Sequence, residues 1–106
     1  MSYIVVIPHL TFHDVRTALI KTIHKDLIDD VVVVYEKAIL NSDDYVKLRS
    51  VAVEKLSKYS GRDFALVLTG SYAACIIVYD VIKSLGGKVV LLQYSPGKRK
   101  YEIIEA

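Results

Sequence analysis

Three small residues, Thr69, Gly70 and Ser71, follow a short apolar run and precede an apolar helical pattern, a spacing that suits anion binding. The run from Phe64 to Leu68 has no polar face, which is typical of a parallel strand covered on both sides. Gly70 allows a sharp turn, and Ser71 can cap the helix that follows. The free N–H groups and the dipole at the start of such a helix attract phosphate. A capped turn that binds nothing is an equal alternative.

Two histidines are the candidates for proton transfer. His9 follows Pro8, which ends the first apolar run, and its imidazole can take or give a proton near neutral pH. His13 lies in the first turn of a predicted helix, where the dipole favours the neutral, basic form. The alternative is that both are surface histidines that donate hydrogen bonds within their loops. Pro8 and the cap at Thr11 keep the two off one helical face, so we predict no metal site.

Positive charge is concentrated beyond the fourth predicted strand, where Lys98, Arg99 and Lys100 follow one another. We expect Lys98 and Arg99 to lie on the same edge of the sheet as the Thr69 turn and to attract an anion. The alternative is a solvated hairpin tip whose cations protect an edge strand. The predicted ligand-binding residues are Leu10, Thr11, Thr69, Gly70, Ser71, Tyr72, Lys98 and Arg99.

Composition bounds the class of protein. A chain of 106 residues, 53% apolar and 25% charged, is predicted to form a single domain over residues 1–106, and its scarcity of Asn, Gln, Cys and Met resembles heat-adapted proteins. A net charge of +2 does not indicate binding to duplex nucleic acid. The single Cys75 excludes an internal disulfide, and no apolar stretch reaches the roughly 20 residues that cross a bilayer. Because no signal peptide pattern is present, we expect a cytoplasmic protein without membrane contact.

Periodicity divides the chain into five strands and three helices. Strands are predicted at about residues 3–7, 31–35, 64–68, 88–94 and 99–105. Helices are predicted from Thr11 to about Lys25, from about Tyr45 to Tyr59 and from Tyr72 to Leu85. Asp29 and Asp30 are expected to break the pattern before the second strand, whose β-branched and aromatic residues predict burial on both faces. The apolar stripe of the second helix is Tyr45, Leu48, Ala52, Leu56 and Tyr59.

The third predicted helix is apolar nearly all the way round. Between Tyr72 and Leu85 its only charges are Asp80 and Lys83. Such a helix must be covered on every side, and one sheet covers only one side. We therefore predict a symmetric homodimer through helix 72–85, which is the commonest form of soluble oligomer. The alternative is that another helix of the same chain covers it.

The order of the elements predicts an α/β fold, a Rossmann-like three-layer sandwich. Short connections and right-handed crossovers favour a parallel sheet of order 2-1-3-4 with helices on both faces and an antiparallel C-terminal edge strand. The order reverses between the first and third strands, where a crevice opens at the carboxyl ends. Segments 8–11 and 69–72 are the predicted walls of this crevice.

The segment LVLTGSYAACIIVYDVIKSLGGKVVLL resembles the strand, Thr-Gly turn and helix of the CRISPR-associated Rossmann fold (CARF) domains. The first half, IVVIPHLTFHDVRTALIK followed by VVVVYEKA, is similar to the opening strand, ligand-facing loop and helix of that family. Thr69 and Gly70 carry most of the resemblance. Leu68 and Ser71 depart from more polar or glycine positions of the family, and the chain is shorter than most such domains.

The resemblance implies a minimal stand-alone CARF-like protein of CRISPR antiviral defence. Such a protein is a homodimer that binds a cyclic oligoadenylate second messenger across its two-fold axis, with no cofactor. Some cleave it as metal-independent ring nucleases, a reaction for which His9 and His13 are the candidate catalytic residues. Two other interpretations stay open. One is a small nucleotide- or phosphate-binding flavodoxin-like domain, in which Glu36 would contact a ribose, and the other is a non-catalytic homodimeric interaction protein.

Overall fold

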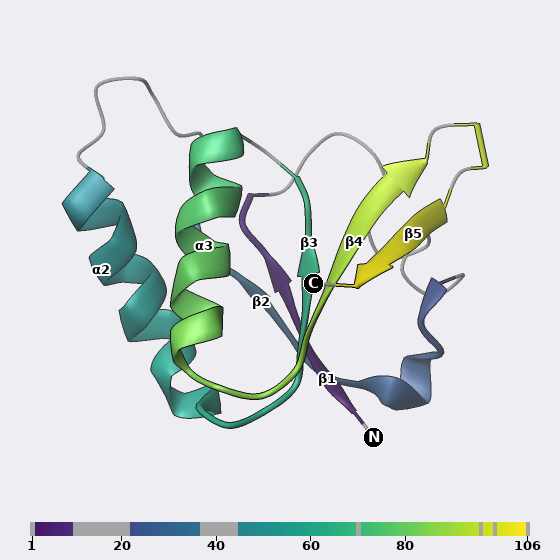
Figure 1. Cartoon of the computed structure of the whole chain (residues 1–106), viewed down its shortest axis with the longest axis horizontal. Helices are drawn as coiled ribbons and strands as arrows, with labels where there is room; N and C mark the ends of the chain where they lie inside the picture. Colours follow the sequence, from purple (N-terminus) through teal and green to yellow (C-terminus); the bar gives the residue numbers. More distant parts are fainter. Residues whose placement is uncertain are drawn as a thin grey trace.

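The computed structural model describes residues 2–9, 22–36, 45–69, 71–95, 97–98 and 100–105. Its elements are, in chain order, β1 (Tyr3–Ile7), the 3-10 helix η1 (Lys25–Leu27), β2 (Ile28–Val33), α2 (Tyr45–Leu56), the 3-10 helix η2 (Ser57–Tyr59), β3 (Phe64–Val67), α3 (Tyr72–Ser84), β4 (Val89–Ser95) and β5 (Lys100–Glu105). These strands form one sheet in the order β2-β1-β3-β4-β5, with α2 and α3 side by side on one face (Figure 1). The first four strands are parallel, and β5 runs antiparallel to β4.

The mixed α/β sheet has the predicted strand order. The parallel part of order 2-1-3-4 and the antiparallel C-terminal edge are both confirmed. β1, β3, β4 and β5 begin and end within one residue of the predicted bounds. These strands could be located because each is an apolar or β-branched run that ends at a turn signal such as Pro8 or Gly86. The first predicted helix and its cap at Thr11 fall mainly on residues 10–21, which lie outside the described residues.

β2 overlaps its predicted range of 31–35 but begins earlier, and the predicted break at Asp29 and Asp30 and the predicted burial on both faces are wrong. β2 spans Ile28–Val33, so Asp29 and Asp30 belong to the strand and do not interrupt it. The side chain of Val31 is 46% exposed, so the strand is not buried on both faces. The physical reason is its place at the edge of the sheet, with only β1 beside it. Charged side chains are tolerated on an edge strand because they can stay in water.

The two described α-helices lie close to their predicted positions. The hydroxyl of Ser71 accepts a hydrogen bond from the N–H of Ala74 at 3.2 Å, so Ser71 caps α3 as predicted. α2 ends at Leu56, and η2 continues it as a tighter 3-10 turn, which is common at helix ends. Of the predicted apolar stripe, Ala52, Leu56 and Tyr59 are buried, whereas Tyr45 is 60% exposed. Neither described helix is long and apolar enough to cross a membrane.

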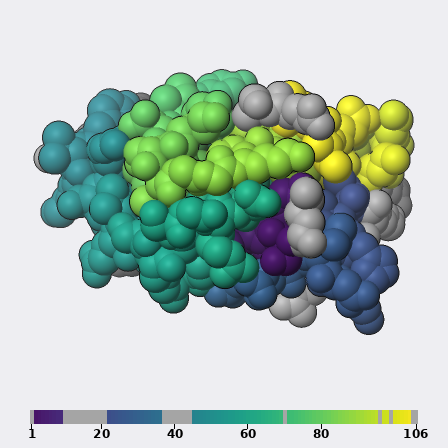
Figure 2. All heavy atoms as spheres, turned by 60° about the horizontal axis from the view of Figure 1, so that its bottom comes forward, coloured from purple at the N-terminus to yellow at the C-terminus, as the bar shows by residue number. Residues whose placement is uncertain are grey.

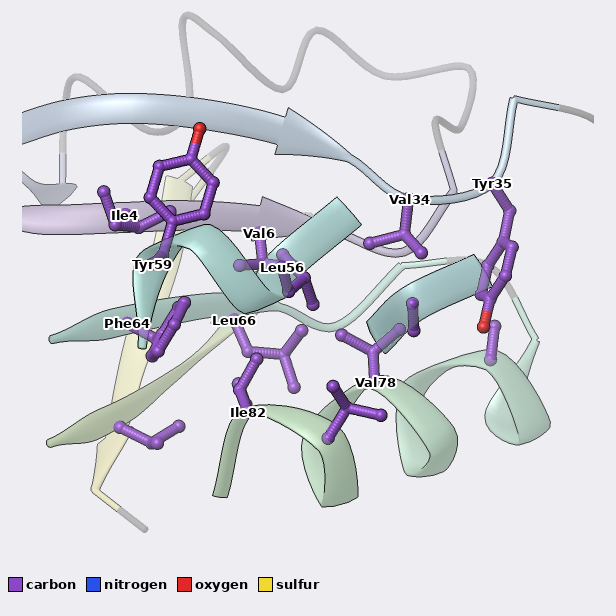
Figure 3. Packing of buried hydrophobic residues seen from close by; sticks show 14 residues of the cluster. Ile4, Val6, Val34, Tyr35, Leu56, Tyr59, Phe64, Leu66, Val78 and Ile82 are labelled. Atoms are coloured by element: carbon purple, nitrogen blue, oxygen red, sulfur yellow. The ribbon is translucent and has the colours of Figure 1, made fainter. Parts of the chain in front are cut away.

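The central strands are buried on both sides because alternate side chains enter different clusters. The cluster under α2 and α3 includes Ile4, Val6, Leu56, Phe64, Leu66, Val78 and Ile82 (Figure 3). The cluster on the other side of the sheet includes Val5, Ile7, Ile23, Ala65, Val67, Leu92 and Tyr101. β1 and β3 contribute to both, which explains why their sequences are apolar without alternation.

The turn before β4 brings two distant segments into direct contact. Gly86 and Gly87 both have a positive φ, of 83° and 84°. A Cβ atom on Gly87 would lie 2.0 Å from the carbonyl oxygen of Arg62, whereas one on Gly86 would meet nothing within 4 Å. Figure 2 shows the teal residues that precede β3 against the green residues that follow α3 at this end of the molecule. Gly87 is therefore required both by its backbone conformation and by the lack of space.

We expect Gly87→Ala to lower the free energy of unfolding by more than about 3 kcal/mol, because the methyl group must push the Arg62 carbonyl away. Gly86→Ala is the matched control, since it suffers only the left-handed backbone strain of about 1–2 kcal/mol. Urea unfolding followed by circular dichroism measures both. Equal losses for the two variants would contradict the close approach.

A hydrogen bond ties η2 to β2. The ring of Tyr59 is buried in the cluster under α2, and its hydroxyl points toward β2 (Figure 3) and donates to the carboxylate of Asp30. The N–H of Val31 donates to the same carboxylate at 2.8 Å. The bond from Tyr59, followed by that from Val31, holds the pKa of Asp30 below its ordinary value of 3.8. The same bond to Asp30 raises the pKa of Tyr59.

This pair makes stability depend on pH in the acid range. Because the pKa of Asp30 is lower in the folded protein, its contribution is complete above the ordinary pKa of 3.8 and is lost as the pH falls through the folded pKa. Tyr59→Phe keeps the ring but removes the donor. We expect this variant to be less stable than the unmodified protein at about pH 7, and the difference to shrink below about pH 3.8. Urea unfolding at both pH values tests this, and a constant difference would contradict it.

Candidate functional site

One side-chain hydrogen bond joins the loops that leave β1 and β3. The hydroxyl of Thr69 donates to the carbonyl oxygen of His9 at 2.6 Å. Thr69 is buried and follows β3, whereas His9 follows Pro8 at the end of β1. Residues from the two predicted walls therefore touch at the point where the strand order reverses. In open α/β sheets this is the place where ligands bind.

The imidazole of His9 is held by the chain that leaves β2. Its Nδ1 lies 2.9 Å from the carbonyl oxygen of Tyr35. Because a carbonyl oxygen can only accept, Nδ1 carries the proton and Nε2 of the neutral ring keeps its lone pair. The side chain of His9 is half-buried. An imidazole fixed in this tautomer can accept a proton or a hydrogen bond at Nε2.

Tyr35 is itself fixed by neighbouring elements. Its N–H donates to the carbonyl oxygen of Pro8 at 2.9 Å, and its hydroxyl donates to the carbonyl oxygen of Leu48 in α2 at 2.6 Å. Burial raises the pKa of Tyr35 to about 12, so the hydroxyl stays protonated and remains a donor at neutral pH. The position of His9 is thereby tied to β2 and α2 as well as to β3.

Thr69, Ser71 and Tyr72 belong to the second predicted wall. The thiol of Cys75 donates to the carbonyl oxygen of Thr69 at 3.2 Å, and burial raises the pKa of Cys75, which keeps it in the S–H form. Both the hydroxyl and the carbonyl of Thr69 are thus used inside the protein. Thr69 supports the crevice, whereas Ser71 and Tyr72 are exposed beside it. Ser71 accepts at its hydroxyl oxygen as a helix cap, so its hydroxyl proton can be donated to a ligand.

The remaining predicted site residues are placed as follows. Lys98 lies at the β4–β5 turn, on the same edge of the sheet as the crevice but separated from β3 by β4 (Figure 1). Its ammonium group lies 3.0 Å from the carboxylate of Glu102. The structure therefore does not bring Lys98 to Thr69 and His9. Leu10, Thr11, His13, Gly70 and Arg99 lie outside the described residues, so their assignments stay predictions.

Charged groups near the crevice are few within the described ranges. Glu36 is exposed and directly follows Tyr35. His24 has a structural role elsewhere: its Nδ1 accepts a hydrogen bond from the N–H of Asp26 at 3.2 Å and so caps η1. No three His, Cys, Asp or Glu side chains of the described residues lie close enough together to hold a metal ion. Among the described residues at this edge, the start of α3 is the group whose dipole and N–H groups could attract an anion.

The sequence patterns do not reveal the roles of Tyr35 and Cys75, because they place Tyr35 at a strand end and Cys75 within the apolar helix 72–85. A local signal exists for Cys75, because it lies four residues after the cap Ser71 and so one turn further along the same helical face. No local signal exists for Tyr35. Its carbonyl meets His9 across 26 residues of chain, a contact that only the packing of β1 against β2 creates.

Comparison with protein-family models, with curated proteins and with solved structures finds no match to this chain. The resemblance around Thr69 and Gly70 therefore stays a prediction. The function is argued from the geometry of the crevice itself.

We expect Thr69→Val, which keeps the shape but removes the donor, to lower the free energy of unfolding by about 1–3 kcal/mol. Thr69→Ser is the control, because it keeps the hydroxyl and loses one methyl group, a cost of about 0.8 kcal/mol. The imidazole NMR signals of His9 should shift in the valine variant and stay in place in the serine variant. Unchanged His9 signals in Thr69→Val would contradict the supporting role of this bond.

Proposed function

We propose that this protein is a CARF-like module that binds a cyclic oligoadenylate across the groove of a homodimer. The observation that carries the proposal is the bond from Thr69 to His9, which joins the two loops at the reversal of strand order. The capped start of α3 lies beside this junction. We further propose that the chain forms the Rossmann-like three-layer sandwich that the order of its elements predicts.

The chemistry of the crevice suits a phosphodiester. Each linkage of an oligoadenylate carries a single negative charge, which the positive end of a helix dipole and its free N–H groups can balance without a metal ion. The backbone N–H groups of Ser71 and Tyr72 are the proposed phosphate donors, with the hydroxyl of Ser71 as a further donor. A two-fold axis would bring two such helix ends to one groove, which matches a ring-shaped ligand of the same symmetry.

Ring cleavage is the proposed activity of the bound complex, with His9 as the catalytic residue. Nε2 would take the proton of a ribose 2′-hydroxyl, whose oxygen attacks the adjacent phosphorus in line. The new O–P bond forms a 2′,3′-cyclic phosphate as the bond to the 5′ oxygen breaks. That oxygen then takes the proton back from the His9 imidazolium, so the neutral imidazole is restored and the charge balances without an external reactant. The Tyr35 carbonyl supports this role because it fixes the required tautomer of His9.

Two observations favour other functions. Glu36 is exposed next to the crevice, where a flavodoxin-like domain that binds a mononucleotide could use it to hold a ribose. Exposed apolar side chains on α3 also suit a homodimeric interaction protein without catalysis. A thermal shift series with cyclic oligoadenylates, linear oligoadenylates and adenosine monophosphate distinguishes these functions.

We expect cyclic oligoadenylates to raise the melting temperature of the unmodified protein, because a ligand that binds only the folded state stabilises it by mass action. Linear oligoadenylates and adenosine monophosphate are the comparison ligands in the same thermal shift series. A shift with the mononucleotide alone would favour the flavodoxin-like alternative. If no anionic ligand raises the melting temperature, the non-catalytic interaction protein is the remaining interpretation.

Two variants separate binding from chemistry within this prediction. Gly70→Val should abolish the shift and leave the fold intact, because the side chain blocks the approach of a phosphate to the backbone. His9→Ala should keep the shift and slow cleavage by a factor of about 100 or more, since a general base acts only in the transition state. Cleavage by His9→Ala at the unmodified rate would exclude His9 from the chemistry.

A further inference from the structure

The most exposed large apolar side chains of the described residues gather at one place. Tyr45 and Val46 open α2, and Tyr72 and Ile76 lie in the first two turns of α3. Each of the four is at least 60% exposed, whereas the other exposed large apolar side chains in the described ranges are at most 53% exposed. Both helices begin at the edge where β3 ends (Figure 1). These four side chains make up the helix patch, and its α3 part adjoins the Thr69 turn because Tyr72 is the first residue of α3.

An ion pair between the two helices adjoins the helix patch. The guanidinium of Arg49 in α2 pairs with the carboxylate of Asp80 in α3, and both side chains remain largely exposed. Val46 precedes Arg49 by three residues and so shares its helical face. Ile76 precedes Asp80 by four residues and shares its face in the same way. Because α2 and α3 run side by side in the same direction (Figure 1), both apolar residues lie on the same side of the ion pair.

We propose that the helix patch and the Arg49–Asp80 pair contact the same surface of a second copy of this chain. The inference rests on the proposed homodimer and adds α2 to an interface that the sequence assigns to helix 72–85 alone. Large exposed apolar patches that are rimmed by polar groups mark interaction sites. The place of the patch next to the crevice would set two crevices side by side.

The charges of this surface are complementary to themselves. In a two-fold interface, if residue i contacts residue j of the partner, then j contacts i. A two-fold axis beside the ion pair therefore sets Arg49 of each protomer against Asp80 of the other. Each carboxylate then lies between two guanidinium groups, and like charges are kept apart. Arginine suits this position because its guanidinium offers five donors and is weakly hydrated.

The two edges of the sheet are weaker candidates for the surface that contacts the second copy. At the β2 edge the ammonium of Lys55 lies 2.7 Å from the carbonyl oxygen of Val34, and the Asp30 carboxylate occupies the N–H of Val31. Charges held against backbone groups protect an edge from further pairing. The β5 edge exposes Ile103, whose side chain lines a separate hollow of about 210 Å³. Ile103 therefore supplies a matched control.

Charge exchange tests the proposal in solution. In Arg49→Asp both charged positions, 49 and 80, are acidic. In Asp80→Arg both are basic. Each variant therefore repels its own copy. We expect the dissociation constant of each variant alone to rise at least about 100-fold. An equimolar mixture should form a one-to-one dimer, because acidic and basic protomers complement each other across the interface but not within a chain. Sedimentation velocity at micromolar concentration measures all three samples.

Three further variants test which elements lie in the interface. Val46→Glu and Ile76→Glu should dissociate the dimer, whereas Ile103→Glu should leave it intact. If Ile76→Glu is monomeric but Arg49→Asp and Val46→Glu dimerise normally, α2 is not in the interface and the proposed homodimer survives. Mixed variants that stay monomeric would overturn the pairing of Arg49 with the partner. An unmodified protein that is monomeric would overturn both the homodimer and this inference, while ligand binding is judged separately by the melting temperature.

Discussion

The parallel pairing of β1 with β3 at the centre of the sheet is the constraint on which the other parts depend. Both strands are buried on both sides, so their backbone groups must bond to neighbouring strands and their side chains must be covered. Parallel pairing puts their carboxyl ends at the same edge. β2 lies outside β1, and β4 lies outside β3, so the strand order reverses between these two ends, which is where ligands bind in open α/β sheets.

The crevice is held by hydrogen bonds between uncharged groups. The Thr69 hydroxyl, the Tyr35 carbonyl and the Cys75 thiol each contact a different part of the two loops. The Cys75 thiol keeps its proton at neutral pH because burial raises its pKa, and burial likewise raises the pKa of Tyr35, whose hydroxyl donates to Leu48. These three groups already form hydrogen bonds within the protein. Under the proposed function, the groups that would contact the ligand are the start of α3, the hydroxyl of Ser71 and Nε2 of His9.

The surface of the molecule divides into protected and unprotected parts. Lys55 and Asp30 occupy backbone groups at the β2 edge, and Arg62 pairs with Asp29 on the same strand. The starts of α2 and α3 instead expose large apolar side chains. Exposed apolar patches mark interaction sites, which is the basis of the proposed homodimer.

The sequence by itself determined the order of the strands, the bounds of α3 and its cap at Ser71. These features follow from local patterns, because an unbroken apolar run predicts a central strand and a small polar residue before an apolar helix predicts a cap. Tertiary structure alone decided that Asp29 and Asp30 join a strand, since only an edge position leaves them in water. It also decided that the Tyr35 carbonyl orients His9 and that Arg49 meets Asp80. Each of these contacts joins residues that are far apart in the chain, so no local pattern records it, and it exists only once the sheet and its helices have packed.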